Sequence, residues 1–258
     1  MILDEVKEEY VKDLMQRGER VDGRGMNDYR EIKVQKDIIP NAEGSALADI
    51  GGSKVIAGVK LGVLAPFADR PEEGVLMFNS EFSPMAHPEF EEGPPNEHSI
   101  ELARVVDRGI RSAEIIDMKK LFIADKKVYA VFVDLYVLDN CGNLIDTAAL
   151  ATMAALKGAK MPAYDADKEA LNYDDRGQKL EVLRDVVSTS FEKIAGKFAV
   201  DATDEEEVAS DGRLTLATCS DDLLCCGQKS GAAAFSKDDL LQLADLAFEK
   251  RKELVRHL

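Results

Sequence analysis

Apolar residues recur every three or four positions at the start of the chain. The repeating positions are Leu3, Val6, Tyr10 and Leu14. Gly18 follows where a helix commonly ends, because glycine adopts the left-handed backbone conformation easily. The pattern predicts an amphipathic helix over residues 2–17 that buries these four side chains.

The following segments change to a pattern typical of short strands. The segments 31–39, 44–51 and 53–62 carry β-branched residues, and Gly44, Gly51, Gly52 and Gly62 separate them, which predicts a meander of short antiparallel strands. Residues 81–97 then contain four prolines and paired acids, which favours an irregular loop over most of this length. The apolar segment 127–138 predicts a further strand.

Two more helices are predicted around that strand. Asn96 is a suitable N-cap for a helix over residues 97–111, and Glu97 brings negative charge to its first turn. An alanine-rich segment predicts another helix that begins on Asp146 and ends near Gly158. Its small side chains allow close approach to a sheet, so we interpret it as buried structure.

The order of strands followed by a helix recurs in the second half. Strands are predicted within 185–200, 213–220 and 222–231, and a final helix starts at Ser236, with Asp239 three residues on as in a capping box. The chain is therefore expected to have an α+β fold with two related halves, each a mixed or antiparallel sheet packed with helices.

Composition narrows the choice of partners. With 258 residues, 45% of them hydrophobic, the chain can bury a substantial core. Its formal net charge is -16, and residues 163–211 alone hold 14 acidic and 6 basic residues. Such acidity argues against a protein that coats nucleic acid, because that binding depends mainly on cationic contacts to phosphates. Any contact with RNA has to be local.

Several kinds of site are not expected. The four cysteines contain no Cys-x-x-Cys pair, and none of the three histidines has metal-ligand spacing with a cysteine or another histidine, so neither a metal nor a cofactor is predicted. No run of eighteen apolar residues occurs, and Asp4 and Glu5 interrupt the segment where a signal peptide would be apolar. We expect a cytoplasmic protein without membrane contact.

Three arginines share one face of the helix at 97–111. At about 100° per residue, Arg108 lies about 40° and Arg111 about -20° from Arg104 on a helical wheel. The apolar residues of the helix fall on the opposite side. The wheel therefore predicts that the arginines point outward while the helix packs on the core.

Acidic neighbours at helical spacing predict which arginine stays unpaired. Arg104 and Arg111 each have two acids three or four residues away, whereas Arg108 has none. These acids are Glu101 and Asp107 for Arg104, and Asp107 and Glu114 for Arg111. One interpretation is a solvated, salt-bridged helix face. The other is a stripe that contacts phosphates, led by Arg108.

Four stretches, 19–32, 42–60, 93–111 and 131–156, closely resemble the RNase PH family, and within it the archaeal exosome subunit type that lacks its own active site. The resemblance implies a single RNase PH-like domain over residues 1–258, with its core at about 19–258. It also implies a hexameric ring, a trimer of heterodimers with a catalytic RNase PH-like partner, and RNA-binding cap proteins on one face. Such rings degrade RNA from its 3′ end with phosphate as the attacking species.

The same resemblance implies that this chain has no active site. Catalytic members carry two adjacent arginines where this chain has Glu97 and His98, and a Gly-Thr-Arg phosphate site where it has residues 142–146. Of an aspartate pair in those enzymes, Asp201 matches one member, while the register at Asp211 leaves the other open. A carboxylate and a neutral imidazole do not replace guanidinium groups as phosphate ligands.

Three hypotheses are compatible with these observations. The first is a non-catalytic ring subunit that structures its partner's active site and binds single-stranded RNA through Arg108, Arg111 and Arg104. The resemblance implies that Arg108 faces RNA beside the active site of the neighbouring subunit. The second is a competent phosphorolytic 3′ to 5′ exoribonuclease that uses Asp201. The third is a structural spacer without RNA contact.

Overall fold

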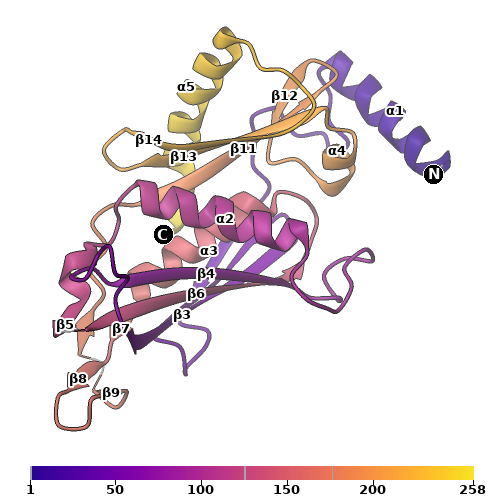
Figure 1. Ribbon diagram of the computed structural model, residues 1–258. Coiled ribbons are helices and arrows are strands. Elements are labelled where there is room, and N and C mark those ends of the chain that lie inside the picture. Colours follow the sequence, from indigo (N-terminus) through magenta and orange to yellow (C-terminus); the bar gives the residue numbers. More distant parts are fainter. Residues whose placement is uncertain (1, 125, 176) are drawn as a thin grey trace.

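Two sheets enclose a layer of helices. The computed structural model describes residues 2–124, 126–175 and 177–258. In Figure 1, helices α2 (Glu97–Ser112) and α3 (Leu144–Gly158) lie between a larger sheet and a smaller one, and α5 (Lys237–Leu254) covers the outer face of the smaller sheet. The α+β class with one sheet in each half is therefore confirmed.

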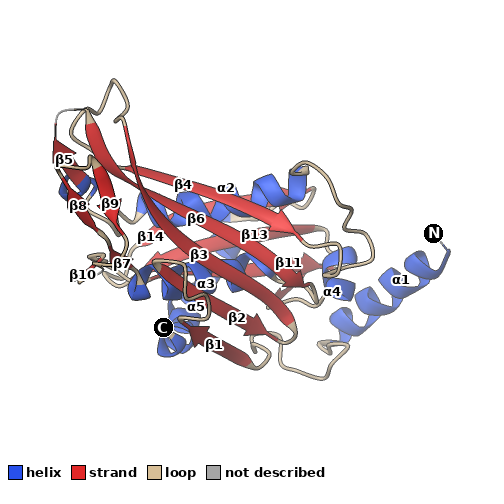
Figure 2. Ribbon diagram, turned by 90° about the horizontal axis from the view of Figure 1, so that it is seen from below, coloured by secondary structure: helices blue, strands red, loops and turns tan. Residues whose placement is uncertain are grey.

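The larger sheet belongs to the N-terminal half, and Figure 2 shows its open face. Its strand order is β1-β2-β3-β6-β4, with β5 paired to β6, and all pairs are antiparallel except β4 with β6. The strands are β1 (Ile32–Lys36), β2 (Gly44–Ile50), β3 (Ser53–Leu64), β4 (Val75–Phe82), β5 (Phe122–Ala124) and β6 (Lys127–Asp139). The predicted meander corresponds to β1, β2 and β3.

The smaller sheet belongs to the C-terminal half and is antiparallel, with order β12-β11-β13-β14. Its strands are β11 (Val186–Ile194), β12 (Lys197–Val200), β13 (Gly212–Cys219) and β14 (Leu224–Gly231). Between the two sheets in sequence, β7 (Lys160–Met161) pairs with β10 (Gln178–Lys179), and β8 (Ala163–Asp165) pairs with β9 (Ala170–Asn172). The short elements are helix α4 (Asp204–Val208) and the 3-10 helices η1 (Met118–Leu121) and η2 (Val255–His257).

Helix α3 is buried on every side from Ile145 to Leu156 because it contacts both sheets. Five alanines and no side chain larger than methionine allow this close packing. The helix begins at Leu144, two residues before the predicted Asp146, since Gly142 and Asn143 take left-handed conformations that end the preceding turn and start the helix. The prediction of a buried helix is confirmed and its start is corrected.

Helix α1 (Ile2–Arg17) has the predicted bounds but buries a different face. Val11 and Met15 pack with Ile194 and Ala199 of the smaller sheet. Val6 and Tyr10, which were expected to be buried, are 59% and 58% exposed. The side chain of Leu3 lies outside the described residues. The prediction of the buried face is wrong because the helix has two apolar stripes, and the tertiary contact selects the one with Val11 and Met15.

The caps predicted for two helices are present. Asn96 caps α2, and Ser236 with Asp239 forms the predicted capping box of α5. The patterns missed β4, β5, the four short strands between residues 160 and 179, and α4. Among the described residues, no helix is both long and apolar enough to cross a bilayer. The largest core cluster combines side chains of both halves, while the single-domain description of residues 1–258 stays a prediction.

A buried ion pair fixes the N-terminal segment to the C-terminal half. The side chains of Arg20 and Glu206 are both fully buried, and Arg20 Nε donates to Glu206 Oε1 at 2.9 Å. The same guanidinium donates to the carbonyl oxygens of Val200 and Asp201. Glu206 also accepts a hydrogen bond from the backbone of Thr203, closing the capping box of α4. Every polar group of this contact therefore has a partner.

Glu206→Ala should destabilise the protein by about 3–5 kcal/mol, because it leaves the Arg20 guanidinium buried without its carboxylate. Glu205→Ala is the matched control, since Glu205 is 42% exposed and meets Lys7 only at 3.8 Å. Its effect should stay below about 1 kcal/mol. Urea unfolding at neutral pH measures both, and equal effects of the two variants would contradict the structural role of the buried pair.

Candidate functional site

The arginine face of α2 lies as the wheel predicts. Arg104, Arg108 and Arg111 are exposed, while the opposite side of the helix is buried. The buried residues are Ser99, Leu102, Ala103, Val105, Val106, Gly109 and Ile110. The helix packs against β4, α3 and β14, so both sheets hold it in place.

The pairing of these arginines differs in part from the prediction. Arg111 pairs with Asp107 at 2.6 Å, as expected, and also donates to the carbonyl oxygen of Leu76. Arg108, predicted to be free, donates from Nη1 to Oε1 of Gln228 on β14 at 3.0 Å. Within the ranges that the structure describes, Arg104 forms no hydrogen bond or ion pair.

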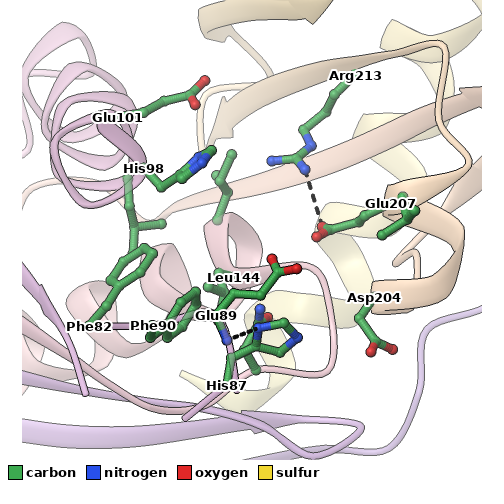
Figure 3. Close-up of a pocket in the computed structure, with 14 residues that line it drawn as sticks. Phe82, His87, Glu89, Phe90, His98, Glu101, Leu144, Asp204, Glu207 and Arg213 are labelled. Carbon is green, nitrogen blue, oxygen red and sulfur yellow. Dashed lines mark hydrogen bonds and ion pairs between the residues drawn. The ribbon is translucent and has the colours of Figure 1, made fainter. Parts of the chain in front are cut away.

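The physical reason is competition for the two acids that flank Arg104. Asp107 is engaged by Arg111. Glu101 reaches from α2 toward a cavity, where its charge helps to raise the pKa of Arg213 (Figure 3). The prediction that Glu101 and Asp107 neutralise Arg104 is therefore wrong, and of the three arginines on α2 Arg104 is the one without a fixed partner among the described residues.

That cavity lies beside the N-terminus of α3 and has a volume of about 320 Å³. Phe82 and Phe90 form part of its wall, with ring centroids 4.7 Å apart. Its charged lining comprises Glu89, Glu101, Asp204, Glu207 and Arg213, and His87 and His98 also reach it. Four carboxylates against one guanidinium make the cavity acidic. We refer to it as the acidic cavity.

Glu207 occupies the place where an anion would meet the start of α3. Its Oε1 accepts a hydrogen bond from the backbone N–H of Asn143 at 2.9 Å, and Arg213 Nη2 lies 3.2 Å from the same oxygen (Figure 3). A helix N-terminus with a neighbouring guanidinium is a favourable environment for negative charge. Here the chain's own carboxylate fills that environment.

Arg213 is also committed to internal partners. Its Nε donates to Glu192, which is almost fully buried. Burial would lower the pKa of Arg213, but the charges of Glu207 and Glu192 outweigh burial and raise it. The one cation in the lining thus has two carboxylates of its own, which leaves little positive potential for an added phosphate.

Asp201 is buried and fully hydrogen-bonded. Its side chain is inaccessible to solvent and accepts hydrogen bonds from Arg24, Arg30 and Asn143 at 2.7–3.0 Å. Burial alone would raise the pKa of Asp201, but the hydrogen bonds and charge of Arg30 lower it below its usual value. Asp201 therefore has the environment of a permanently ionised structural group.

Asp146 and Asp211, like Asp201, are not among the residues that line the acidic cavity. Asp146 is buried and bonded to Tyr29, Asn143 and Ser190, and burial raises its pKa to about 6. Asp211 accepts from the backbone of Ala195 and lies 3.7 Å from Lys12. Among the described residues, no cluster of three or more histidine, cysteine or acidic side chains has the geometry of a metal site.

Family models identify the two halves. Residues 28–162 match domain 1 of the 3′ exoribonuclease (RNase PH) family, and residues 186–250 match domain 2 of the same family. The chain belongs to the RNase PH family. This confirms the family resemblance, and the boundary between the two matches falls between the larger and the smaller sheet.

Similar proteins of the RNase PH family include exosome components. The exosome complex component Rrp42 of Methanothermobacter thermautotrophicus is 39% identical, over 100% of this chain and 96% of that protein. The Rrp42 component of Archaeoglobus fulgidus is 40% identical, over 98% of this chain and 96% of that protein.

Solved structures agree with these sequence matches. A chain of the Archaeoglobus fulgidus exosome with RNA bound to the active site superposes with a TM-score of 0.91 and 40% identity, covering 99% of both chains. A chain of an archaeal exosome core gives a TM-score of 0.84 at 37% identity, covering 98% of both chains. The similarity to this branch of the RNase PH family therefore extends over the whole fold.

Sequence reasoning missed Glu207 and Gln228. Glu207 meets Asn143 across 64 residues of sequence, and Gln228 meets Arg108 across 120. Helical spacing predicts only contacts between residues of the same helix, so no sequence pattern indicates either of these contacts. The run of acids from Asp204 to Glu207 was visible, but its position beside the α3 N-terminus follows only from the pairing of β11, β12 and β13.

Asp201→Asn should lower the free energy of unfolding by about 3–5 kcal/mol at pH 7, because the variant leaves buried guanidinium groups without their carboxylate. The pKa of Asp201 is lowered in the folded state, so its stabilising contribution is present above the ordinary Asp pKa of about 4 and is lost as pH falls through the folded pKa. The difference from wild type should therefore shrink as the pH falls below about 4.

Urea unfolding of both proteins between pH 7 and pH 3 measures this difference. Asp221→Asn is the control, because Asp221 is 49% exposed and pairs with Arg184 at the surface. It should cost less than about 1 kcal/mol at any pH. An Asp201→Asn cost that is small, or independent of pH, would contradict the assigned role.

Proposed function

We propose that this chain is a non-catalytic subunit of an archaeal RNA exosome ring. In this proposal it structures the active site of a catalytic RNase PH-like partner and helps to hold single-stranded RNA during phosphate-dependent degradation from the 3′ end. The similarity to Rrp42 components along the whole chain, and to exosome structures of which one holds RNA, supports the assembly. The hexameric arrangement, the contact with cap proteins and the cytoplasmic location remain predictions.

The position of Glu207 is the observation that carries the non-catalytic role. A phosphorolytic active site has to bind phosphate where it can attack, and the helix N-terminus suited to an anion here bonds to Glu207. If a phosphate displaced the Glu207 side chain, the Glu207 carboxylate would lie close to Glu192, to Asp204 and to the doubly charged phosphate itself. Coulomb repulsion opposes this arrangement in a partly buried cavity.

The alternative of a competent enzyme that uses Asp201 has less support. A general acid or base has to exchange a proton near neutral pH and to reach the substrate. The side chain of Asp201 is fully buried, and its pKa is lowered away from that range. The third hypothesis, a spacer without RNA contact, does not explain why α2 exposes three cations on an acidic protein.

The protein alone should not shorten RNA, whether or not phosphate is present, because the acidic cavity does not accept the attacking anion. Incubation of a 5′-labelled single-stranded RNA with the chain alone, with its catalytic partner alone and with both together measures this. Phosphate-dependent shortening is expected to be highest for the complex. Shortening by the isolated chain that requires phosphate would overturn the proposal.

Arg108→Ala in the assembled complex should weaken RNA binding and lower the steepness of its salt dependence by about 0.7 on a log-log plot, since one phosphate contact is lost. Binding is measured without phosphate across a series of salt concentrations, so that the RNA stays intact. Arg17→Ala is the matched control, because Arg17 is also an exposed arginine but lies on α1 and pairs with Asp13. If RNA binding by wild type and by Arg108→Ala showed the same salt dependence, the hypothesis of a structural spacer without RNA contact would be favoured.

A further inference from the structure

Arg108 is held by a residue from the other half of the molecule. Its Nη1 donates to Oε1 of Gln228 at 3.0 Å. The contact depends on close packing of α2 on the smaller sheet, where a Cβ atom at Gly109 would lie only 3.2 Å from the side chain of Ala217. Arg108 also lies near Cys226, whose pKa is raised by burial while the positive charge of Arg108 opposes the rise. The smaller sheet thus fixes where Arg108 stands.

The chemistry of this contact leaves the charge of Arg108 intact. A guanidinium group only donates, so the Gln228 amide has to present its oxygen. Gln228 is neutral, unlike Asp107, which meets Arg111 with a full negative charge. Arg108 forms no other hydrogen bond or ion pair within the described part of the chain. One of its five N–H donors is therefore used for orientation, and four are left for a ligand.

The three arginines of α2 differ in how firmly they are held and in whether their charge is paired. Arg104 has no fixed partner among the described residues, so a ligand has to immobilise its flexible side chain on binding. Arg111 is held, but its charge is paired. Arg108 alone among the three combines a fixed direction with an unpaired charge. Preorganisation of this kind improves affinity because the rotamer entropy is already lost before the ligand arrives.

We propose that Gln228 is a positioning residue that orients the Arg108 guanidinium toward a backbone phosphate of single-stranded RNA. The inference rests on the proposed function, since it requires Arg108 to contact RNA. It adds that β14 of the C-terminal half takes part in the RNA-binding face, through a residue that keeps the arginine charged and directed.

A double-mutant cycle tests this proposal in the assembled complex. Affinity for an unstructured 5′-labelled RNA is measured without phosphate for wild type, Gln228→Leu, Arg108→Ala and the double variant. Gln228→Leu should weaken binding by about 2- to 12-fold, the range expected for the loss of one hydrogen bond. In the Arg108→Ala background it should have no further effect. Ser230→Ala, two residues along the same face of β14, should bind like wild type.

The outcomes separate the two proposals. If Arg108→Ala leaves RNA binding unchanged, the RNA-contact function itself fails. If Arg108→Ala weakens binding but Gln228→Leu does not, only the positioning role of Gln228 fails. Equal effects of Gln228→Leu in both backgrounds would also overturn it, because Gln228 would then act independently of Arg108.

Gln228→Glu provides a second test that does not remove the hydrogen bond. The new carboxylate still accepts from Arg108 but cancels its charge, so RNA binding should weaken and the log-log salt slope should fall by about 0.7, as for Arg108→Ala. Binding with the wild-type affinity and slope would contradict the proposal even if Gln228→Leu assembles poorly.

Discussion

The hydrogen-bonded carboxylate of Asp201 holds the two halves of the molecule together. It accepts hydrogen bonds from Arg24 and Arg30 in the segment before β1, and from Asn143 in the turn before α3. Arg30 also donates hydrogen bonds to the carbonyl oxygens of Cys141 and Gly142. One ionic cluster therefore fixes the N-terminal segment, the start of α3 and the end of β12. A carboxylate with this many donors is stable only when ionised, which is consistent with its lowered pKa.

This cluster places the groups that decide the chemistry of the chain. It sets the turn in which Asn143 offers its backbone N–H, and α4, which follows Asp201, brings Glu207 to that N–H. The N-terminus of α3, which favours an anion, therefore already binds the chain's own carboxylate, that of Glu207. Asp201, which the resemblance matches to a catalytic aspartate of the RNase PH family, is occupied by hydrogen bonds within the chain, and the three arginines of α2 stay exposed.

The sequence predicted what depends on local periodicity. The alternation in β1, β2 and β3, the Asn96 cap and the outward direction of the three arginines all follow from one element at a time. The buried face of α1 was mispredicted because two apolar stripes compete, and the choice is made by Ile194 and Ala199 of the smaller sheet. The partner of Arg108 was mispredicted for the same reason, since Gln228 comes from a distant strand. For Arg104, Asp107 pairs with Arg111 on the same helix, and the charge of Glu101 acts on Arg213 of β13.

The location of phosphorolysis in the assembled ring tests the central claim most directly. A complex is prepared in which this chain is unchanged and only the catalytic partner carries an inactivating substitution in its own active site. The release of nucleoside diphosphates from single-stranded RNA is then measured in the presence of phosphate. We expect no release above background, because the acidic cavity of this chain does not support the reaction. Phosphate-dependent release that persists in this complex would show that the chain is itself an enzyme.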